Sequence, residues 1–308
     1  MIFYPPPNTW LIGLVSLLAI STLGIFEESF AQELVIIPRG EVEDTNSLVL
    51  DAARQVSVLS VNDKYYAVVT AIADDGVQII DVTDPENPVT KGSIITNNTL
   101  RLAAATAVST YTIEDKHYAI VSGNADNGIQ ILEITDQGTI TAKGTLNTIQ
   151  TQVSSAIIDM AKYSIRDKYY AAVASVSSSI HISFQIFDVT DPDNIIPKDA
   201  SNRPNILNPY GIDIYSIGNS HYAVVVGNER NGIHIREVTN PDKIIRKQTI
   251  YFNGPNGDGV GGVASLESAT GVDVYSTGGR YYAVVTSELG KVQIMDVSNP
   301  NRMIPKGL

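Results

Sequence analysis

The sequence lacks cysteine altogether, and it holds only four histidines in 308 residues. The absence of cysteine excludes disulfides, thiolate zinc sites and cysteine nucleophiles, while so few histidines argue against a His-rich metal centre. Positive charge is also scarce, because 21 Lys and Arg stand against 33 Asp and Glu and leave a net charge of −12. Nucleic-acid phosphates require a basic surface, so we expect no nucleic-acid partner.

Long apolar stretches are missing as well, except at the N-terminus. Residues 10–26 (WLIGLVSLLAISTLGIF) carry no charge, and Ser29 and Ala31 supply small residues at positions −3 and −1 of a cleavage site. This pattern predicts a secretory signal peptide over residues 1–31. The alternative is an uncleaved N-terminal anchor, slightly shorter than the roughly 20 apolar residues that span a bilayer. With either, residues 32–308 would be secreted or displayed at the cell surface.

The chain is rich in copies of one hexapeptide that begins with tyrosine. The copies start at Tyr66, Tyr118, Tyr170, Tyr222 and Tyr282. The first three steps between successive starts are each 52 residues, and the last step is 60 residues. A fixed period of this length indicates a repeat architecture. The repeats run over about 50–101, 102–153, 154–205, 206–265 and 266–308.

Each repeat predicts four short strands. Alternating apolar and polar residues mark the first strand, most clearly at residues 211–217 and 271–277. The tyrosine hexapeptide is a continuously apolar second strand, suited to burial on both faces. An Asp-Gly or Asn-Gly turn follows and leads to a third strand that ends in an acid. A turn with proline then leads to a short fourth strand with Lys. Four antiparallel strands in about 50 residues predict an all-β fold, a β-propeller of about five four-stranded antiparallel blades.

The unit resembles the LVIVD repeat, a propeller-type repeat of bacterial and archaeal surface proteins. In the first copy the residues that carry the resemblance are Tyr66 to Val69, Gly76, Val77 to Val82 and Thr83-Asp84-Pro85. The resemblance covers residues from about 35 to 308. It implies a propeller at the cell surface and supplies no catalytic residues. The eight extra residues before the fifth copy depart from the pattern.

Residues 35–42 (VIIPRGEV) look like an additional fourth strand, similar to residues 303–308 and 89–94. The chain then holds five sets of the first three strands and six fourth-strand segments. Propellers often close when a strand from one terminus completes the last blade. We therefore expect residues 35–42 to close the fifth repeat in a five-blade ring. The alternative is an open part of a larger ring, with an exposed and aggregation-prone sheet edge.

One face of such a propeller collects the turns between second and third strands together with the crossovers between blades. Binding residues gather on loops held by a rigid scaffold, so this is the candidate binding face. It comprises Asp74, Asp75, Asp126, Glu229, Glu288 and, in the long crossover, Asn253, Asn256 and Asp258. Two more acids, Asp213 and Asp273, recur on the first strand and are candidates for the central channel.

These acids have two interpretations. Ca²⁺ takes six to eight oxygen ligands, so calcium is the ion that the face or channel could bind. The simpler interpretation is turn chemistry, because Asp or Asn before Gly suits a tight hairpin. The carboxylates also belong to different blades, and Ser57, Ser109 and Ala161 replace Asp213 in other repeats. No cofactor is therefore expected.

Catalytic motifs are missing too, since the chain has neither a Gly-x-Ser-x-Gly elbow nor a His-Glu-x-x-His helix. The sequence therefore predicts a non-catalytic extracellular binding or scaffold protein whose partner is a surface protein or a glycan. The alternative is a calcium-dependent propeller hydrolase or lactonase with its site at the channel mouth. Contact with a membrane is expected only through the N-terminal segment.

Overall fold

The computed structural model describes residues 38–44, 47–147, 156–176, 184–201, 207–229, 232–251 and 268–306. The chain divides into two units, Met1–Pro38 and Arg39–Leu308, and every strand belongs to the second. The predicted signal peptide over residues 1–31 lies outside the described residues. Within them, no helix is long and apolar enough to cross a membrane.

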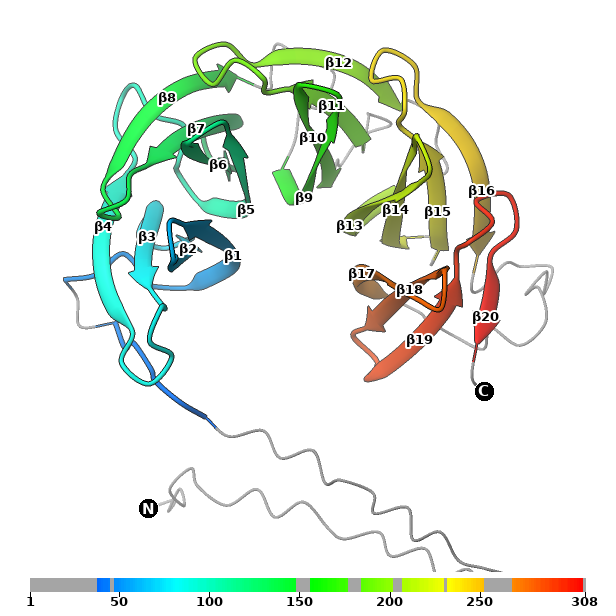
Figure 1. Ribbon diagram of the computed structural model, residues 1–308, viewed down its shortest axis with the longest axis horizontal. Coiled ribbons are helices and arrows are strands. Elements are labelled where there is room, and N and C mark those ends of the chain that lie inside the picture. Colours follow the sequence, from blue (N-terminus) through cyan, green and yellow to red (C-terminus); the bar gives the residue numbers. More distant parts are fainter. Residues whose placement is uncertain are drawn as a thin grey trace, which may run out of the picture. The chain divides into compact units, whose positions relative to one another are not determined.

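The second unit is built from five antiparallel sheets of four strands each, which confirms the predicted fold class (Figure 1). We call them blades 1 to 5 in chain order. Blade 1 contains β1 (Ala53–Val61), β2 (Lys64–Ala71), β3 (Gly76–Asp81) and β4 (Val89–Ile95). Blade 2 contains β5 (Ala105–Ile113), β6 (Lys116–Gly123), β7 (Gly128–Ile134) and β8 (Ile140–Asn147).

The other three blades repeat this order. Blade 3 contains β9 (Ala156–Ile165), β10 (Lys168–Val176), β11 (Phe184–Asp188) and β12 (Ile196–Ser201). Blade 4 contains β13 (Leu207–Ile217), β14 (Ser220–Glu229), β15 (Gly232–Glu237) and β16 (Ile245–Tyr251). Blade 5 contains β17 (Ala269–Thr277), β18 (Arg280–Ser287), β19 (Lys291–Asp296) and β20 (Ile304–Lys306).

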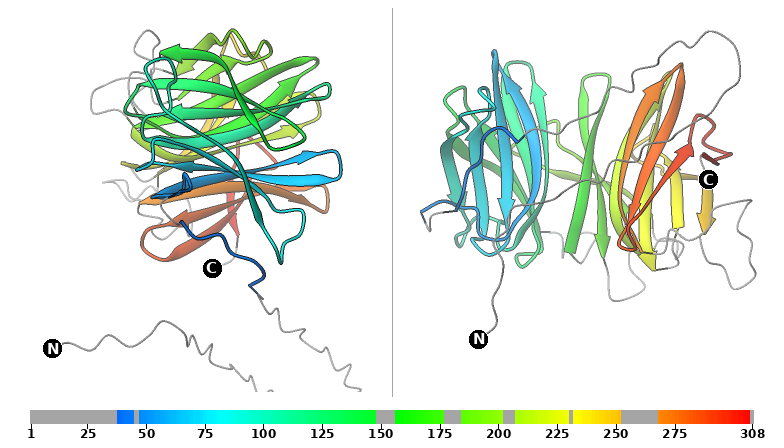
Figure 2. Two further views of the ribbon diagram at one scale, coloured as in Figure 1. Left: turned by 90° about the vertical axis from the view of Figure 1, so that its left-hand side faces the viewer. Right: turned by 90° about the horizontal axis from the view of Figure 1, so that it is seen from below.

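The blades follow one another around a central axis, with the first strand of each innermost and the fourth outermost (Figures 1 and 2). In each blade, consecutive strands pair antiparallel, as in the register Ser57↔Val68 and Val68↔Ile79 of blade 1. The inner strand therefore has one unpaired edge, which faces the axis. This edge positions the candidate site.

Hydrophobic cores lie between neighbouring blades. In blade 2, Ala119 and Val121 pack toward blade 1, while Ile120 packs toward blade 3. The second strand is thus buried on both faces, which explains its unbroken apolar run. Four such cores join the five blades in sequence.

The periodic tyrosine is a packing residue, as the sequence predicted. Tyr118 is buried and contacts the ring of Tyr111 on the inner strand, 5.3 Å between centroids. The hydroxyl of Tyr111 then donates to the carbonyl oxygen of Val189 in the next blade, at 3.2 Å. His221 occupies an aromatic position and contacts the Tyr163 ring at 5.7 Å. His221 therefore packs here as an aromatic ring would.

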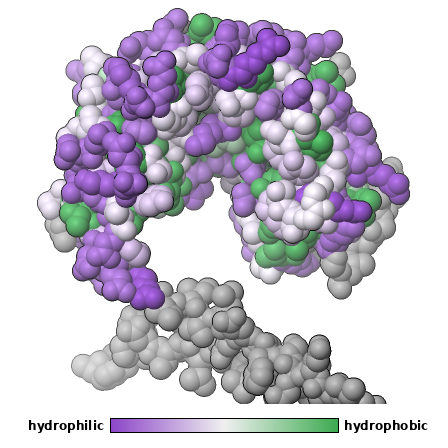
Figure 3. All heavy atoms as spheres, viewed as in Figure 1, coloured by the Kyte–Doolittle hydropathy of each residue, from purple (hydrophilic) through white to green (hydrophobic). Residues whose placement is uncertain are grey.

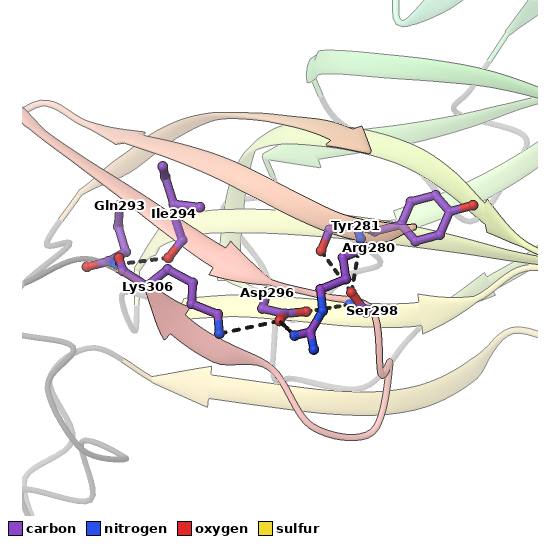
Figure 4. Close-up of polar contacts among 7 residues, drawn as sticks. All are labelled: Arg280, Tyr281, Gln293, Ile294, Asp296, Ser298 and Lys306. Atoms are coloured by element: carbon purple, nitrogen blue, oxygen red, sulfur yellow. Dashed lines mark hydrogen bonds and ion pairs between the residues drawn. The ribbon is translucent and has the colours of Figure 1, made fainter. Parts of the chain in front are cut away.

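Two polar residues of the third strand also have structural roles, shown for blade 5 in Figure 4. The side-chain amide of Gln293 donates to the carbonyl oxygens of Ile294 and Lys306, at 2.9 and 2.8 Å, and so joins the third strand to the fourth. Asp296 accepts hydrogen bonds from the Ser298 amide and from Arg280, both at 3.1 Å. The repeated Gln and Asp are thus explained by strand pairing and turn formation.

Of the expected closing strand over residues 35–42, residues 35–37 lie outside the described residues, and residues 38–42 do not pair with blade 5. The sheet of blade 5 is completed by its own β20, and residues 38–42 lie in no strand. Arg39 instead forms an ion pair with Glu86 of blade 1, and Gly40 lies against Pro85 and Pro88. The reason is local: blade 5 supplies all four of its strands, so its outer edge has no place for a second terminal strand.

Candidate functional site at the channel mouth

The inner strands are held together by polar side chains that reach from one blade to the next. Each accepts a hydrogen bond from a backbone N–H on the neighbouring inner strand: Gln55 from Val108 at 2.6 Å, Ser57 from Thr110 at 3.2 Å, Asp159 from Ile212 at 2.9 Å and Asp213 from Val274 at 2.8 Å. Unpaired edge N–H groups need such acceptors when water is scarce. The ring of inner strands therefore concentrates polar atoms around the axis.

A cavity of about 440 Å³ opens where these strands begin. Its lining comes from blades 1, 3, 4 and 5: Arg54, Gln55, Ile158, Asp159, Tyr210, Thr270, Gly271, Val272 and Glu288. This volume lies in the range of small-molecule sites. A Cβ on Gly211 would lie 3.0 Å from the Gly271 Cα, so glycine at this position allows the inner strands of blades 4 and 5 to approach closely.

Asp159 is the carboxylate on the wall of this cavity. Its Oδ1 accepts a 2.7 Å hydrogen bond from the Gln55 side chain, which reaches it from blade 1. Burial raises the pKa of Asp159, although the hydrogen bonds from Ile212 and Gln55 oppose that shift. The sequence did not single out Asp159. The only sequence feature that marks it is its charge, because the equivalent positions of the other repeats hold Gln55, Ala107, Gly211 and Gly271.

Asp213 and Asp273 lie one layer deeper, each two residues beyond a glycine at the mouth. Two residues of strand correspond to about 7 Å. The pKa of Asp213 is raised to about 6, chiefly by burial and also by the adjacent carboxylate of Asp273, which hydrogen-bonds to it. The amides of Ile214 and Val274 act in the opposite direction. The structure thus brings together the two acids that the sequence proposed for the channel, as a hydrogen-bonded pair.

The predicted binding-face acids of blades 1 and 2 lie beside the crossovers and hold them in place. Asp74 accepts from the Asp51 amide at 2.7 Å, and Asp75 accepts from the Ala104 amide at 2.7 Å. Asp126 accepts from the Ala103 amide at 2.8 Å and from the Thr96 hydroxyl at 3.1 Å. These contacts match the turn-chemistry interpretation.

The remaining predicted residues divide into three cases. Glu288 lines the same cavity as Asp159. Glu229 ends β14, where it pairs with Leu207 in the backbone register. Asn253, Asn256 and Asp258 lie outside the described residues.

Metal ligation finds no support in the described part of the chain. No group of three or more His, Cys, Asp or Glu side chains there is placed to hold a metal ion. The Asp213–Asp273 pair falls short of this because its third neighbour in the layer, Ala161, has no polar atom. The Asp213–Asp273 pair is therefore better suited to proton transfer than to metal binding.

Neither a protein-family model nor a curated protein matches the sequence. Among solved structures, the GH32 β-fructofuranosidase BmSUC1 of Bombyx mori is similar over 84% of this chain and 62% of its own, with 9% identity and a TM-score of 0.47. An α-L-arabinofuranosidase from Lactobacillus brevis is similar over 83% and 91%, with 12% identity and a TM-score of 0.48. The β-xylosidase RS223 is similar over 83% and 96%, with 10% identity and a TM-score of 0.48.

These similarities contradict the prediction of a non-catalytic scaffold, because all three proteins are named as enzymes that cleave glycosides. That prediction is withdrawn. The chain spans less than two thirds of the fructofuranosidase. At such low identity the likeness concerns the fold alone, so the activity of this chain has to be argued from its own side chains.

Proposed function

We propose that the channel mouth is the active site of a hydrolase that cleaves glycosidic bonds by acid–base catalysis. The observation that carries this proposal is the Asp213–Asp273 pair, in which Asp213 has a pKa of about 6. Such a carboxyl group is still substantially protonated in mildly acidic solution, where an ordinary aspartate is ionised. Hydrolysis of an acetal requires a protonated acid on one side of the bond and an ionised carboxylate on the other, and Asp159 is the candidate for the second group.

The lining of the cavity favours a glycoside over an ester or a peptide. Among the described residues that line it there is no serine, histidine or lysine, so these residues offer no hydroxyl–imidazole or amine nucleophile for acyl transfer. Tyr210 offers a ring face for a sugar, while Arg54, Gln55 and Thr270 offer hydrogen-bonding groups for hydroxyls. The substrate class is therefore a neutral, polyhydroxylated molecule.

In the proposed reaction Asp213 donates its proton to the glycosidic oxygen as the C–O bond to the leaving group breaks. Asp159, in its ionised form, accepts a proton from the water that forms the new C–O bond. Asp159 then releases this proton to solvent and Asp213 takes up a proton from solvent, which restores both groups to their starting forms. The net change is addition of one water across the glycosidic bond, which needs no oxidant or reductant.

The pattern of residues 10–31 supports an extracytoplasmic location for this activity, where glycan polymers are accessible. The LVIVD-like repeat is consistent with the same location. Both remain proposals, and they are independent of the carboxyl chemistry.

The test is hydrolysis of 4-nitrophenyl arabinofuranoside, 4-nitrophenyl xylopyranoside and sucrose between pH 4 and 8. We expect kcat/KM to fall as pH rises through about 6, because Asp213 loses its proton there. Asp213→Asn should lower kcat/KM by about 10²–10⁴-fold, the range for loss of a general acid. Assays with millimolar Ca²⁺ and after chelation test the calcium dependence separately.

Ser57→Ala is the matched control. Ser57 occupies the same repeat position as Asp213 and also accepts an amide hydrogen bond from the next blade, but it has no acid function. Its substitution should leave kcat/KM within about twofold. Equal losses in both variants, or no turnover of any of these glycosides, would refute the proposal.

A further inference from the structure

Blade 1 and blade 5 each leave one face of the sheet uncovered. Each of the four interfaces between consecutive blades buries a hydrophobic core. Among the described residues, no such core joins blade 5 to blade 1. Figure 3 shows a wide hollow between them.

The forward face of blade 5 has the composition of a buried interface but is exposed. Val292 of β19 is 67% exposed, whereas its repeat equivalents Val77, Ile129 and Ile233 are all 0% exposed. Ile294, one pleat further along, is exposed as well. Apolar side chains at these positions pack against the following blade everywhere else in the unit.

The rear face of blade 1 shows the same mismatch. Val58 of β1 is 58% exposed, whereas its equivalent Thr110 in blade 2 is 1% exposed. Val56 is exposed too, while its equivalent Val108 is buried in the core between blades 1 and 2. These two faces are complementary halves of the interface that the chain forms four times.

The tyrosine contacts are interrupted at the same two faces. Tyr215 of blade 4 contacts Tyr281 of blade 5 at 5.5 Å and donates to the Val297 carbonyl oxygen at 2.9 Å. Tyr275 is the equivalent residue of blade 5, and Tyr65 is the equivalent of Tyr281 in blade 1; both are exposed.

Residues 39–40 occupy the outer-strand position of a blade that would precede blade 1. A Cβ on Gly40 would lie 2.8 Å from the Pro85 oxygen, just as one on Gly144 would lie 2.7 Å from the Pro192 oxygen. Gly144 belongs to the outer strand of blade 2, and Pro192 is the equivalent of Pro85 in blade 3. The Arg39–Glu86 ion pair likewise corresponds to Lys198–Asp242 between blades 3 and 4.

We propose that the space between blade 5 and blade 1 is a docking site for a three-stranded antiparallel sheet of the same repeat type, contributed by a partner polypeptide. Its first three strands would pack between Val292 and Val58, with residues 39–40 beside its outer edge. Continuity with the four existing interfaces is the reason for this choice of occupant. The proposal does not depend on the proposed hydrolysis.

The probe is a synthetic peptide of residues 207–238, which spans the first three strands of blade 4. We expect it to bind the full chain at a 1:1 ratio in native mass spectrometry. The melting temperature of the chain should then rise with peptide concentration, because the peptide binds the folded state. A chain with the same segment fused after Leu308 provides a second arm, in which melting temperature should rise without added peptide.

Val58→Asp and Val292→Asp should each weaken peptide binding by about 10-fold or more, since a charge would be buried in an apolar interface. Ile245→Asp is the control, because Ile245 is exposed on the outer strand β16 and should leave binding unchanged. All three residues are exposed, so none of these changes should unfold the chain.

The proposal fails if neither arm stabilises the chain, or if the aspartate variants bind as well as the control. It also fails if the chain without peptide self-associates through Val58 and Val292, since a second copy would then be the occupant.

Discussion

At the residue scale, one backbone conformation recurs in the hairpin between the first and second strands. Asn62, Glu114 and Arg166 take positive φ values of 44°, 52° and 55°, and Gly218 and Gly278 take their place in blades 4 and 5. In the turn between the second and third strands, the positive φ lies at a different residue from the glycine of the Asp-Gly or Asn-Gly pair. Asp75 and Asn127 carry the positive φ there, at 53° and 47°, and not the glycines that follow. Gly76 is required because a Cβ would lie 2.4 Å from the Ile94 oxygen.

His234 provides a residue-scale prediction on pH dependence. It occupies the position of Gln78, Gln130, Gln185 and Gln293 in the other blades, and its Nδ1 lies 2.9 Å from the Thr249 hydroxyl. Burial, assisted by Arg236 and Arg246, lowers its pKa to about 3. The unfolded state therefore binds a proton near pH 6.5 that the folded state does not. The free energy of unfolding should fall as pH decreases from about 6.5 toward 3, with a contribution of up to about 1.4 kcal/mol per pH unit.

His234→Gln should remove this contribution, because the glutamine cannot titrate. At pH 4.5 the variant should exceed the parent in stability by about 2 kcal/mol, and at pH 7.5 the difference should be smaller. Chemical denaturation at both pH values measures it. The titration of Asp213 acts in the opposite sense, because its contribution to the free energy of unfolding falls as pH rises from about 4 to 6. Parent and variant share this contribution, so it cancels in the comparison. An equal difference between variant and parent at both pH values would contradict the prediction.

At the scale of elements, the inner strand of one blade is fastened to the third strand of the next by a tyrosine hydroxyl. Tyr66, Tyr111, Tyr163 and Tyr215 donate in this way to Asp136, Val189, Val238 and Val297. In blade 1 the donor is the second-strand tyrosine, because Leu59 replaces the inner-strand ring. Burial raises the pKa of Tyr111, Tyr163 and Tyr215 above its ordinary value, so these hydroxyls remain donors over the whole neutral range.

Removal of one hydroxyl tests this coupling between blades. Tyr215→Phe should lower the free energy of unfolding by about 1–2 kcal/mol, because the buried Val297 oxygen loses its donor. Tyr275→Phe is the matched control, since Tyr275 is the equivalent residue with an exposed ring, and it should change stability by less than about 0.5 kcal/mol. Urea denaturation of both variants measures the difference, and equal effects would show that the hydrogen bond contributes nothing.

At the scale of the whole unit, stability is distributed along a row of interfaces between neighbouring blades, as in other repeat proteins. Blades 2, 3 and 4 are packed on both faces, whereas blades 1 and 5 are each packed on one. Local opening therefore requires less free energy at the two ends of the row.

Hydrogen exchange should reveal this gradient. We expect amides of β18 and β19 in blade 5 to exchange faster than those of β14 and β15 in blade 4, because Val292 and Ile294 are exposed and Ile233 and Ile235 are buried. Mass spectrometry of peptides from the exchanged protein makes the comparison. Equal protection of the two blades would mean that the forward face of blade 5 is covered in solution.

The sequence by itself determined the strands, their order in each blade and the burial of the tyrosines. These follow from alternation, turn residues and a period of 52 residues, all of which act over short separations. Only the tertiary structure decided that Asp159 lines the mouth while Asp213 and Asp273 pair one layer deeper, and that residues 39–40 lie against blade 1 and not blade 5. The physical reason is that such contacts depend on how each blade packs against the next, and this packing brings together side chains that lie 50 to 100 residues apart in a way that no local pattern records.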